Sequence, residues 1–191
     1  MKIVATDALI VVDVQRDFCP GGALAVNEGD AVVPIINRIA PRFATKVYTR
    51  DWHPADHCSF SATPQYVDGS WPAHCLQDSE GAAFHPALEA PDDALVVNKG
   101  NDPAREAYSA FQDTDLAERL RARSIERVFV CGLATDYCVK STALDAQGEG
   151  FEVVIVEDAC RGVDVPPGSA AKALNELVES GVVRIRSDGI R

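Results

Sequence analysis

The sequence predicts a single α/β domain built on a doubly wound, Rossmann-like parallel sheet of six strands, with helices on both faces. Short apolar runs, typical of strands buried on both faces, alternate along the chain with segments of helical periodicity. The 191 residues are enough for one domain with a sizeable core. Since no repeat, low-complexity tract or linker interrupts the pattern, we expect residues 1–191 to form one unit.

The first half of the chain supplies two strands and a long loop. Residues 8–12 (ALIVV) predict the first strand, and a helix follows that begins near Asp30, because Pro34 is tolerated only in a first helical turn. Residues 46–49 predict the second strand. Residues 52–93 then show little periodicity but contain both tryptophans and all four histidines. A loop this long in a compact domain is usually functional, so we expect it to carry a metal and substrate site.

The second half continues the alternation of strands and helices. Thr114 or Asp115 caps a helix that turns Leu116 and Leu120 inward, and the helix Ser169 to Glu179 is stopped by Gly181. The remaining strands are expected at residues 94–98, 128–131, 152–156 and 182–185.

Charge and cysteine content limit the class of function. Lys and Arg total 18 against 29 for Asp and Glu, and the net charge of −11 argues against nucleic acid or an anionic membrane as partner. No apolar run approaches the ~20 residues that span a bilayer. The N-terminus lacks signal-peptide features and the cysteines form no CxxC pair, which favours free thiols in the cytoplasm. We therefore expect a small-molecule substrate, and a homo-oligomer is left open.

Cys138 is the candidate nucleophile. Gly132 is expected to end the strand 128–131 and Thr135 to cap the next helix, which places Cys138 in a first turn, where the helix dipole lowers a thiol pKa. Asp13 and Lys99 follow the first and third strands, and the carboxyl ends of parallel strands meet at one edge. A thiol, a carboxylate that takes and returns its proton, and an ammonium together predict nucleophilic catalysis.

A second cluster of polar residues has the chemistry of a metal site. Asp51 and His53 are two residues apart in an extended segment, so their side chains point the same way. A more distant histidine, His57, His74 or His85, can close the site. A carboxylate with two imidazoles suits zinc, iron or manganese, and we expect one divalent ion with positions open to water or substrate.

Six motifs, in chain order, carry a family resemblance. They are VVDVQRDFCPGGALAV, DWHPADHCSF, SWPAHC, NKG, AYSAF and CGLATDYCV. With them the chain resembles the nicotinamidases, also called pyrazinamidases, of the isochorismatase-like cysteine hydrolase superfamily. The resemblance implies an isochorismatase-like domain that hydrolyses nicotinamide, and pyrazinamide as well, to the acid and ammonia through a thioester, a reaction of NAD salvage.

The resemblance also assigns residues. It implies Asp13, Lys99 and Cys138 as the catalytic triad and Asp51, His53 and His74 as the metal ligands. It implies a cis peptide within residues 132–134 and an oxyanion hole made by the backbone N–H groups of Ala134 and Cys138. The aromatic residues that would surround the substrate ring are Phe18, Trp71, Tyr108 and Tyr137. Both His57 and Ser59 are available for a fourth metal position, and the short HPADHCSF spacing favours Ser59 acting through water.

Three alternatives remain at this point. A hydrolase of the same superfamily could act on another small amide, although such members lack the metal histidine of the WPxHC motif. A site of two histidines and one carboxylate could belong to a non-haem iron oxygenase, with Cys138 purely structural. A metal-binding or partner-binding protein on an inactive hydrolase scaffold would need a broken triad, and this triad is intact.

Overall fold

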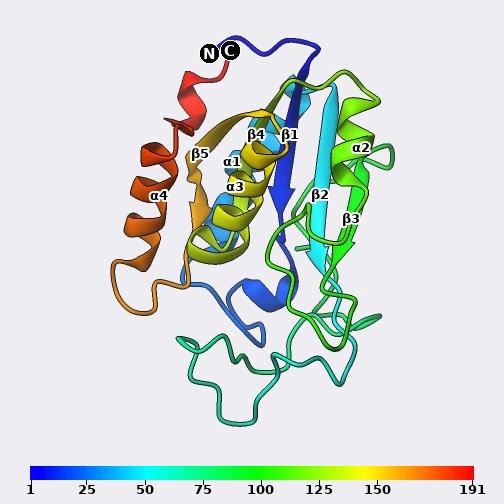
Figure 1. Cartoon of the computed structure of the whole chain (residues 1–191), viewed down its shortest axis with the longest axis vertical. Coiled ribbons are helices and arrows are strands. Elements are labelled where there is room, and N and C mark those ends of the chain that lie inside the picture. The colour runs from blue at the N-terminus through cyan, green and yellow to red at the C-terminus, as the bar shows by residue number, and fades with distance from the viewer.

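A computed structural model describes residues 1–191, and its centre is a six-stranded sheet in which every neighbouring pair is parallel (Figure 1). The strand order is β3-β2-β1-β4-β5-β6, as in a doubly wound fold, which confirms the predicted fold class. The strands are β1 (Asp7–Val12), β2 (Thr45–Asp51), β3 (Leu95–Lys99), β4 (Arg127–Leu133), β5 (Glu152–Arg161) and β6 (Val183–Ile185).

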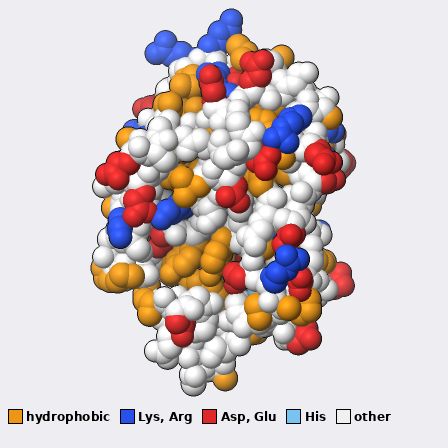
Figure 2. Space-filling model, in the orientation of Figure 1, with side chains coloured by type: hydrophobic (Ala, Val, Ile, Leu, Met, Phe, Trp, Pro, Cys, Tyr) orange, Lys and Arg blue, Asp and Glu red, His pale blue; other side chains and the backbone are white.

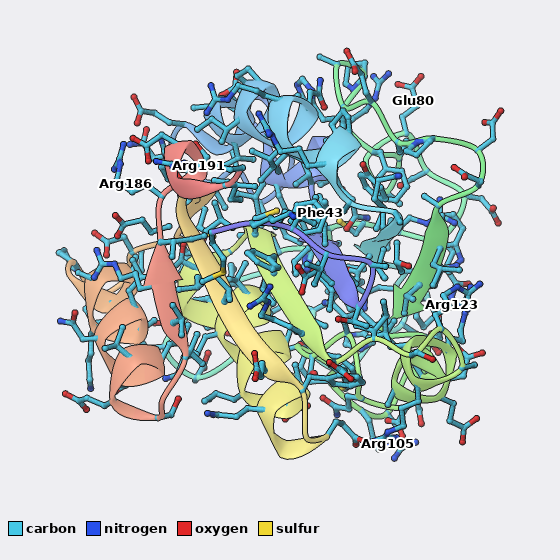
Figure 3. All side chains as sticks on the ribbon, turned by 90° about the horizontal axis from the view of Figure 1, so that it is seen from above. Phe43, Glu80, Arg105, Arg123, Arg186 and Arg191 are labelled. Carbon is cyan, nitrogen blue, oxygen red and sulfur yellow. The ribbon has the colours of Figure 1, made fainter.

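Helices cover both faces of the sheet. The helix α1 (Val33–Ile39) lies on one face, and α2 (Leu116–Arg121), α3 (Lys140–Gly148) and α4 (Ser169–Glu179) lie on the other, as the view from above shows (Figure 3). A short 3-10 turn, Gly29–Val32, leads into α1, and Pro34 stands in its first turn as predicted. Because β1 and β4 are central and covered on both sides, β1 is buried along its whole length.

Four strands run further than their apolar runs predicted. β2 reaches Asp51, β3 includes Lys99, β4 continues to Leu133 and β5 continues to Arg161. Gly132 was expected to end this strand, but β4 continues past it to Leu133. Gly132 has a φ of 114° and pairs with Val12 on one side and Cys160 on the other, at an irregularity in the β4–β5 ladder. Glycine adopts this conformation at little cost, so the strand bends there while keeping its neighbours.

The start of the Cys138 helix also differs from the prediction. Thr135 is not an N-cap; it begins a π-helical turn, Thr135–Val139, that runs directly into α3. Ala134 flanks this turn in an extended conformation, and no side chain caps it. The N–H of Val139 reaches back to the carbonyl of Ala134, five residues earlier. Cys138 still lies in the first turn, which is wider than an α-helical one.

The segment from residue 52 to 94 contains no helix or strand. It passes beyond the carboxyl ends of β1, β2 and β3 and then runs back to the start of β3 (Figure 1). Isolated bridges hold it, among them His53 to Leu76 and Phe60 to Trp71, and Gln15 to Phe84 ties it to the segment after β1. Cys58 in this segment is exposed, whereas the other five cysteines are buried, and all six are free. This segment supplies one wall of the candidate site.

The surface carries mixed charge. On the face seen in Figure 2, Lys and Arg side chains are interspersed with Asp and Glu and form no continuous basic patch. None of the helices is both long enough and apolar enough to cross a membrane.

Candidate active site

Asp13, Lys99 and Cys138 meet at the carboxyl edge of the sheet. Asp13 follows β1, Lys99 is the last residue of β3, and Cys138 lies in the turn after β4. The Nζ of Lys99 is 2.9 Å from Asp13 Oδ2 and 3.3 Å from Cys138 Sγ. A carboxylate oxygen of Asp13 lies within 4.8 Å of the same sulfur. The three side chains predicted to form a triad are thus together, and each is buried.

The two oxygens of Asp13 have different surroundings. Oδ1 accepts a 2.6 Å hydrogen bond from the hydroxyl of Thr49 in β2. Oδ2, the oxygen beside Lys99, accepts no hydrogen bond of normal geometry. Burial raises the pKa of Asp13 above its ordinary value, although Lys99 opposes this effect. Asp13 is therefore a stronger base than an ordinary carboxylate, and Oδ2 is its oxygen without a normal hydrogen bond.

Lys99 joins two groups that the sequence presents separately. Its ammonium also forms an ion pair with Asp51 and a 3.2 Å hydrogen bond to the carbonyl of Ala107. Burial alone would lower the pKa of Lys99, but the carboxylates of Asp13 and Asp51 hold it well above the ordinary value. The lysine therefore stays charged and links the triad to the candidate metal ligands, a link that was not predicted.

The predicted lowering of the Cys138 pKa is wrong. Burial raises the pKa of this thiol well above its ordinary value, and the attraction of Lys99 offsets the rise only in part. Desolvation of the sulfur outweighs its favourable place in a first helical turn. The resting nucleophile is consequently a thiol, which needs a base before it can attack.

Asp51, His53 and His74 form a cluster with the chemistry of a metal site. Asp51 Oδ2 lies 3.6 Å from His53 Nε2 and 3.8 Å from His74 Nε2, and the ligand atoms all lie within 4.8 Å of one another. Nδ1 of His53 is 3.0 Å from the carbonyl of Gly100, and Nδ1 of His74 is 2.8 Å from that of Pro72. Each Nδ1 is thereby the donor, which leaves both Nε2 lone pairs to face one point beside the carboxylate. These residues fit a divalent cation.

One pocket opens onto both clusters. The side chains of Asp51, His74 and Cys138 contribute to its wall, which is otherwise mainly apolar. Trp71 donates a 3.1 Å hydrogen bond from Nε1 to the hydroxyl of Tyr108, and its ring packs edge-on against Tyr137. The whole lining consists of Phe18, Leu24, Asp51, Trp71, His74, Glu106, Tyr108, Ala134, Tyr137, Cys138 and Val163. All four aromatic residues predicted to surround a ring are therefore in the wall.

The family model described as the isochorismatase domain matches residues 7–188. The chain belongs to the isochorismatase family. The nicotinamidase of Escherichia coli (strain K12) is 44% identical to it over 195 residues, which cover 91% of this chain and 92% of that relative.

Two solved structures are also similar to this isochorismatase-family chain. The pyrazinamidase of Pyrococcus horikoshii in complex with zinc is 45% identical, has a TM-score of 0.87, and covers 95% of this chain and 99% of its own. PnC1 from L. infantum in complex with nicotinate is 38% identical, has a TM-score of 0.91, and covers 100% of this chain and 98% of its own.

Three wall residues of this isochorismatase domain are absent from the prediction. Leu24 lies in the loop after β1, and Val163 follows β5 at the same edge of the sheet. The N–H of Val163 donates a 2.9 Å hydrogen bond to Asp136, in the turn of the nucleophile. Glu106 also lines the pocket, and its carboxylate clusters with His53 and His57. Position after a strand could have indicated Val163, but nothing in the sequence singles out Leu24 or Glu106.

The remaining predicted residues have distinct places in this isochorismatase domain. The peptide bond between Leu133 and Ala134 is cis, as the resemblance implied, and Ala134 lines the pocket beside Cys138. His57 and Ser59 lie next to the metal cluster, with the rings of His53 and His57 4.1 Å apart. His85, the third candidate ligand, belongs to none of the clusters that could hold a metal.

Proposed function

We propose that this protein is a nicotinamidase, a hydrolase that cleaves the carboxamide C–N bond of nicotinamide and also accepts pyrazinamide. The observation that carries the proposal is one pocket whose wall includes the thiol of Cys138, the carboxylate of Asp51 and the imidazole of His74. Asp13 and Lys99 adjoin the thiol, and His53 adjoins Asp51 and His74. The relatives named nicotinamidase or pyrazinamidase, and the nicotinate complex of PnC1 from L. infantum, support this substrate class.

We propose that Asp51, His53 and His74 hold one divalent ion, zinc or iron, with manganese as a further alternative. Two imidazoles and a carboxylate suit these metals and leave coordination positions open. When bound, such an ion supplies a Lewis-acidic centre that a pyridine or pyrazine ring nitrogen can coordinate. The zinc complex of the Pyrococcus horikoshii pyrazinamidase supports zinc as the first choice.

Ser59 is the better candidate than His57 for a fourth, water-mediated position. Nε2 of His57 lies 3.1 Å from the carbonyl of Arg105, which can only accept a hydrogen bond, so Nε2 carries the proton. Nδ1 must then accept from the hydroxyl of Ser59 at 2.8 Å. Both ring nitrogens of His57 are thereby occupied, whereas the oxygen of Ser59 keeps acceptor capacity for a bound water.

Acylation begins with proton transfer. Asp13 takes the proton of the Cys138 thiol, and the thiolate attacks the carboxamide carbon to form a tetrahedral adduct. The N–H groups of Ala134 and Cys138 form the oxyanion hole for the developing charge, and the buried ammonium of Lys99 adds to its stabilisation. Asp13 then gives its proton to the departing nitrogen, so that ammonia leaves and an acyl thioester on Cys138 remains.

Deacylation uses the same groups. Asp13 takes a proton from a water molecule, the hydroxide attacks the thioester carbonyl, and the C–S bond breaks to release the carboxylic acid. The proton returns to the sulfur, and the enzyme is regenerated. The aromatic side chains Phe18, Trp71, Tyr108 and Tyr137 hold the ring by packing. Release of the free acid suits a role in NAD salvage, and the six free cysteines favour the cytoplasm.

Ammonia release tests the proposal. We expect kcat/KM for nicotinamide and pyrazinamide to exceed that for aliphatic and carbamoyl amides, and Cys138→Ala to lower kcat by at least ~10⁴-fold, because no other group replaces the nucleophile. Cys58→Ala, which removes an exposed thiol outside the pocket, is the matched control and should keep the parental rate. Turnover of aliphatic amides alone would favour another amide hydrolase, and full activity of Cys138→Ala would refute the mechanism.

A further inference from the structure

The side-chain amide of Gln15 forms hydrogen bonds only with backbone groups. It is fully buried, two residues after Asp13. Its Nε2 donates to the carbonyl of Asp51 at 2.8 Å and to that of Ala82 at 2.9 Å. Its Oε1 accepts from the N–H of Asp51 at 2.8 Å. The side chain therefore binds both the N–H and the carbonyl of Asp51, a candidate metal ligand.

These bonds take the place of a rung of the sheet. The N–H of Asp13 still bonds to the carbonyl of Thr49, at 3.2 Å, as the β1–β2 ladder requires. Asp13 then turns the backbone away from the sheet with a φ of 47°, and the N–H of Gln15 bonds to the carbonyl of Asp13 instead of to β2. Asp51 would be left without a partner from β1. The amide of Gln15, which has the same donor and acceptor as a peptide group, supplies both missing bonds.

We infer that Gln15 is a positioning residue for the metal site, because its side chain stands in for a backbone rung and fixes Asp51 while Asp13 turns towards Lys99. The inference rests on the metal site of the proposed function. Gln15 itself touches neither the pocket nor a candidate ligand atom; it acts through the backbone of Asp51.

The same short segment also anchors the loop that carries His74. Asp17 Oδ2 accepts a 2.7 Å hydrogen bond from the N–H of Cys75, the residue after His74. The third bond of Gln15, to Ala82, ties down a later part of that loop. The chain between the catalytic aspartate and residue 18 therefore holds two of the three ligands in place before any ion arrives.

Zinc affinity of the metal-stripped, full-length protein tests the inference, measured by competition with a chromogenic chelator. Gln15→Leu keeps the volume but loses all three bonds, and Gln15→Glu keeps only the acceptor. We expect zinc affinity to fall about 10–100-fold in Gln15→Leu and less in Gln15→Glu, the range typical of residues that orient ligands. Gln77→Leu is the matched control, since it removes an exposed glutamine amide that bonds the carbonyl of Trp52, next to Asp51; its affinity should stay within about twofold of the parent.

Thr142→Val separates a general loss of stability from a loss at the metal site. It removes a buried hydrogen bond that the hydroxyl of Thr142, in α3, accepts from the N–H of Ala110, and neither residue contacts Asp51, His53 or His74 through this bond. If Gln15→Leu fails to fold, Gln15→Glu carries the comparison. Parental zinc affinity in a folded Gln15 variant, or a loss matched by Thr142→Val, would overturn the inference while leaving the proposed activity intact. A parent that binds zinc without hydrolysing nicotinamide would refute the proposed function only, and a parent that binds no zinc would overturn the inference.

Discussion

Lys99 is the one lysine whose side chain is buried. Its ammonium is buried among two carboxylates, a carbonyl oxygen and the sulfur of Cys138. One positive charge thus compensates both Asp13 and Asp51. A buried ion pair adds little net stability over an apolar substitute, but removing one member leaves the others uncompensated.

Lys99→Met should therefore be strongly destabilising. The substitution keeps the length of the side chain but leaves two buried carboxylates without a counter-charge, and we expect a loss of about 3–5 kcal/mol in the unfolding free energy of the metal-free protein. Lys140→Met is the control, because it breaks a partly exposed ion pair with Glu176; its cost should be about 1 kcal/mol or less. Urea unfolding at neutral pH measures both, and equal losses would contradict this view of Lys99.

At the scale of elements, the strands were predictable and their ends were not. The apolar runs located all six strands, since burial on both faces leaves a continuous hydrophobic signature. The missed extensions of β2 and β3 carry polar residues: Asp51 and Lys99 pair in register at the ends of these strands. A functional carboxylate at a strand end looks like a turn residue in sequence. The π-helical turn before α3 leaves no sequence mark that distinguishes it from an N-cap.

The bend in β4 depends on Gly132. A Cβ at this residue would lie 2.1 Å from the carbonyl oxygen of Val12, and the φ of 114° is itself unfavourable for other residues. Gly132→Ala should lower the unfolding free energy by at least ~2 kcal/mol, because the added methyl group meets the backbone of the central strand β1, which cannot move aside. Gly148→Ala, at the end of α3 with nothing near its added methyl, should be neutral or stabilising by up to ~1 kcal/mol. Thermal unfolding of the pair checks this, and a tolerated Gly132→Ala would refute the close approach.

At the scale of the molecule, the sheet and the long segment differ in what holds them. The sheet and its helices supply most of a core of 45 buried apolar residues, to which residues 52–94 add only Cys75, Ala82 and Leu88. Residues 52–94, by contrast, contain two candidate metal ligands and only isolated bridges. The fold class followed from the pattern of the chain, but the path of this segment could not, because single polar contacts rather than periodicity determine it.

Metal removal should therefore act locally. A ligand that binds only the folded state stabilises it by about 2.7 kcal/mol at 100 times its dissociation constant. We expect stripping of zinc by a chelator to lower the thermal midpoint and to raise amide hydrogen exchange in residues 52–77, with β1 and β4 unchanged. Exchange measured by mass spectrometry on both forms tests this. A uniform rise across the sheet would show that the ion supports the whole fold instead.

Cys58 gives residues 52–94 a single exposed thiol. It is the one exposed cysteine among six, and it stands between His57 and Ser59, at the edge of the metal cluster. A bulky maleimide dye should react there alone in the native state, because four of the other thiols are buried in the core and Cys138 is buried at the wall of the pocket. The natural sequence thus already contains an attachment point for a fluorescent reporter, whose emission would register ion and substrate binding without any mutation.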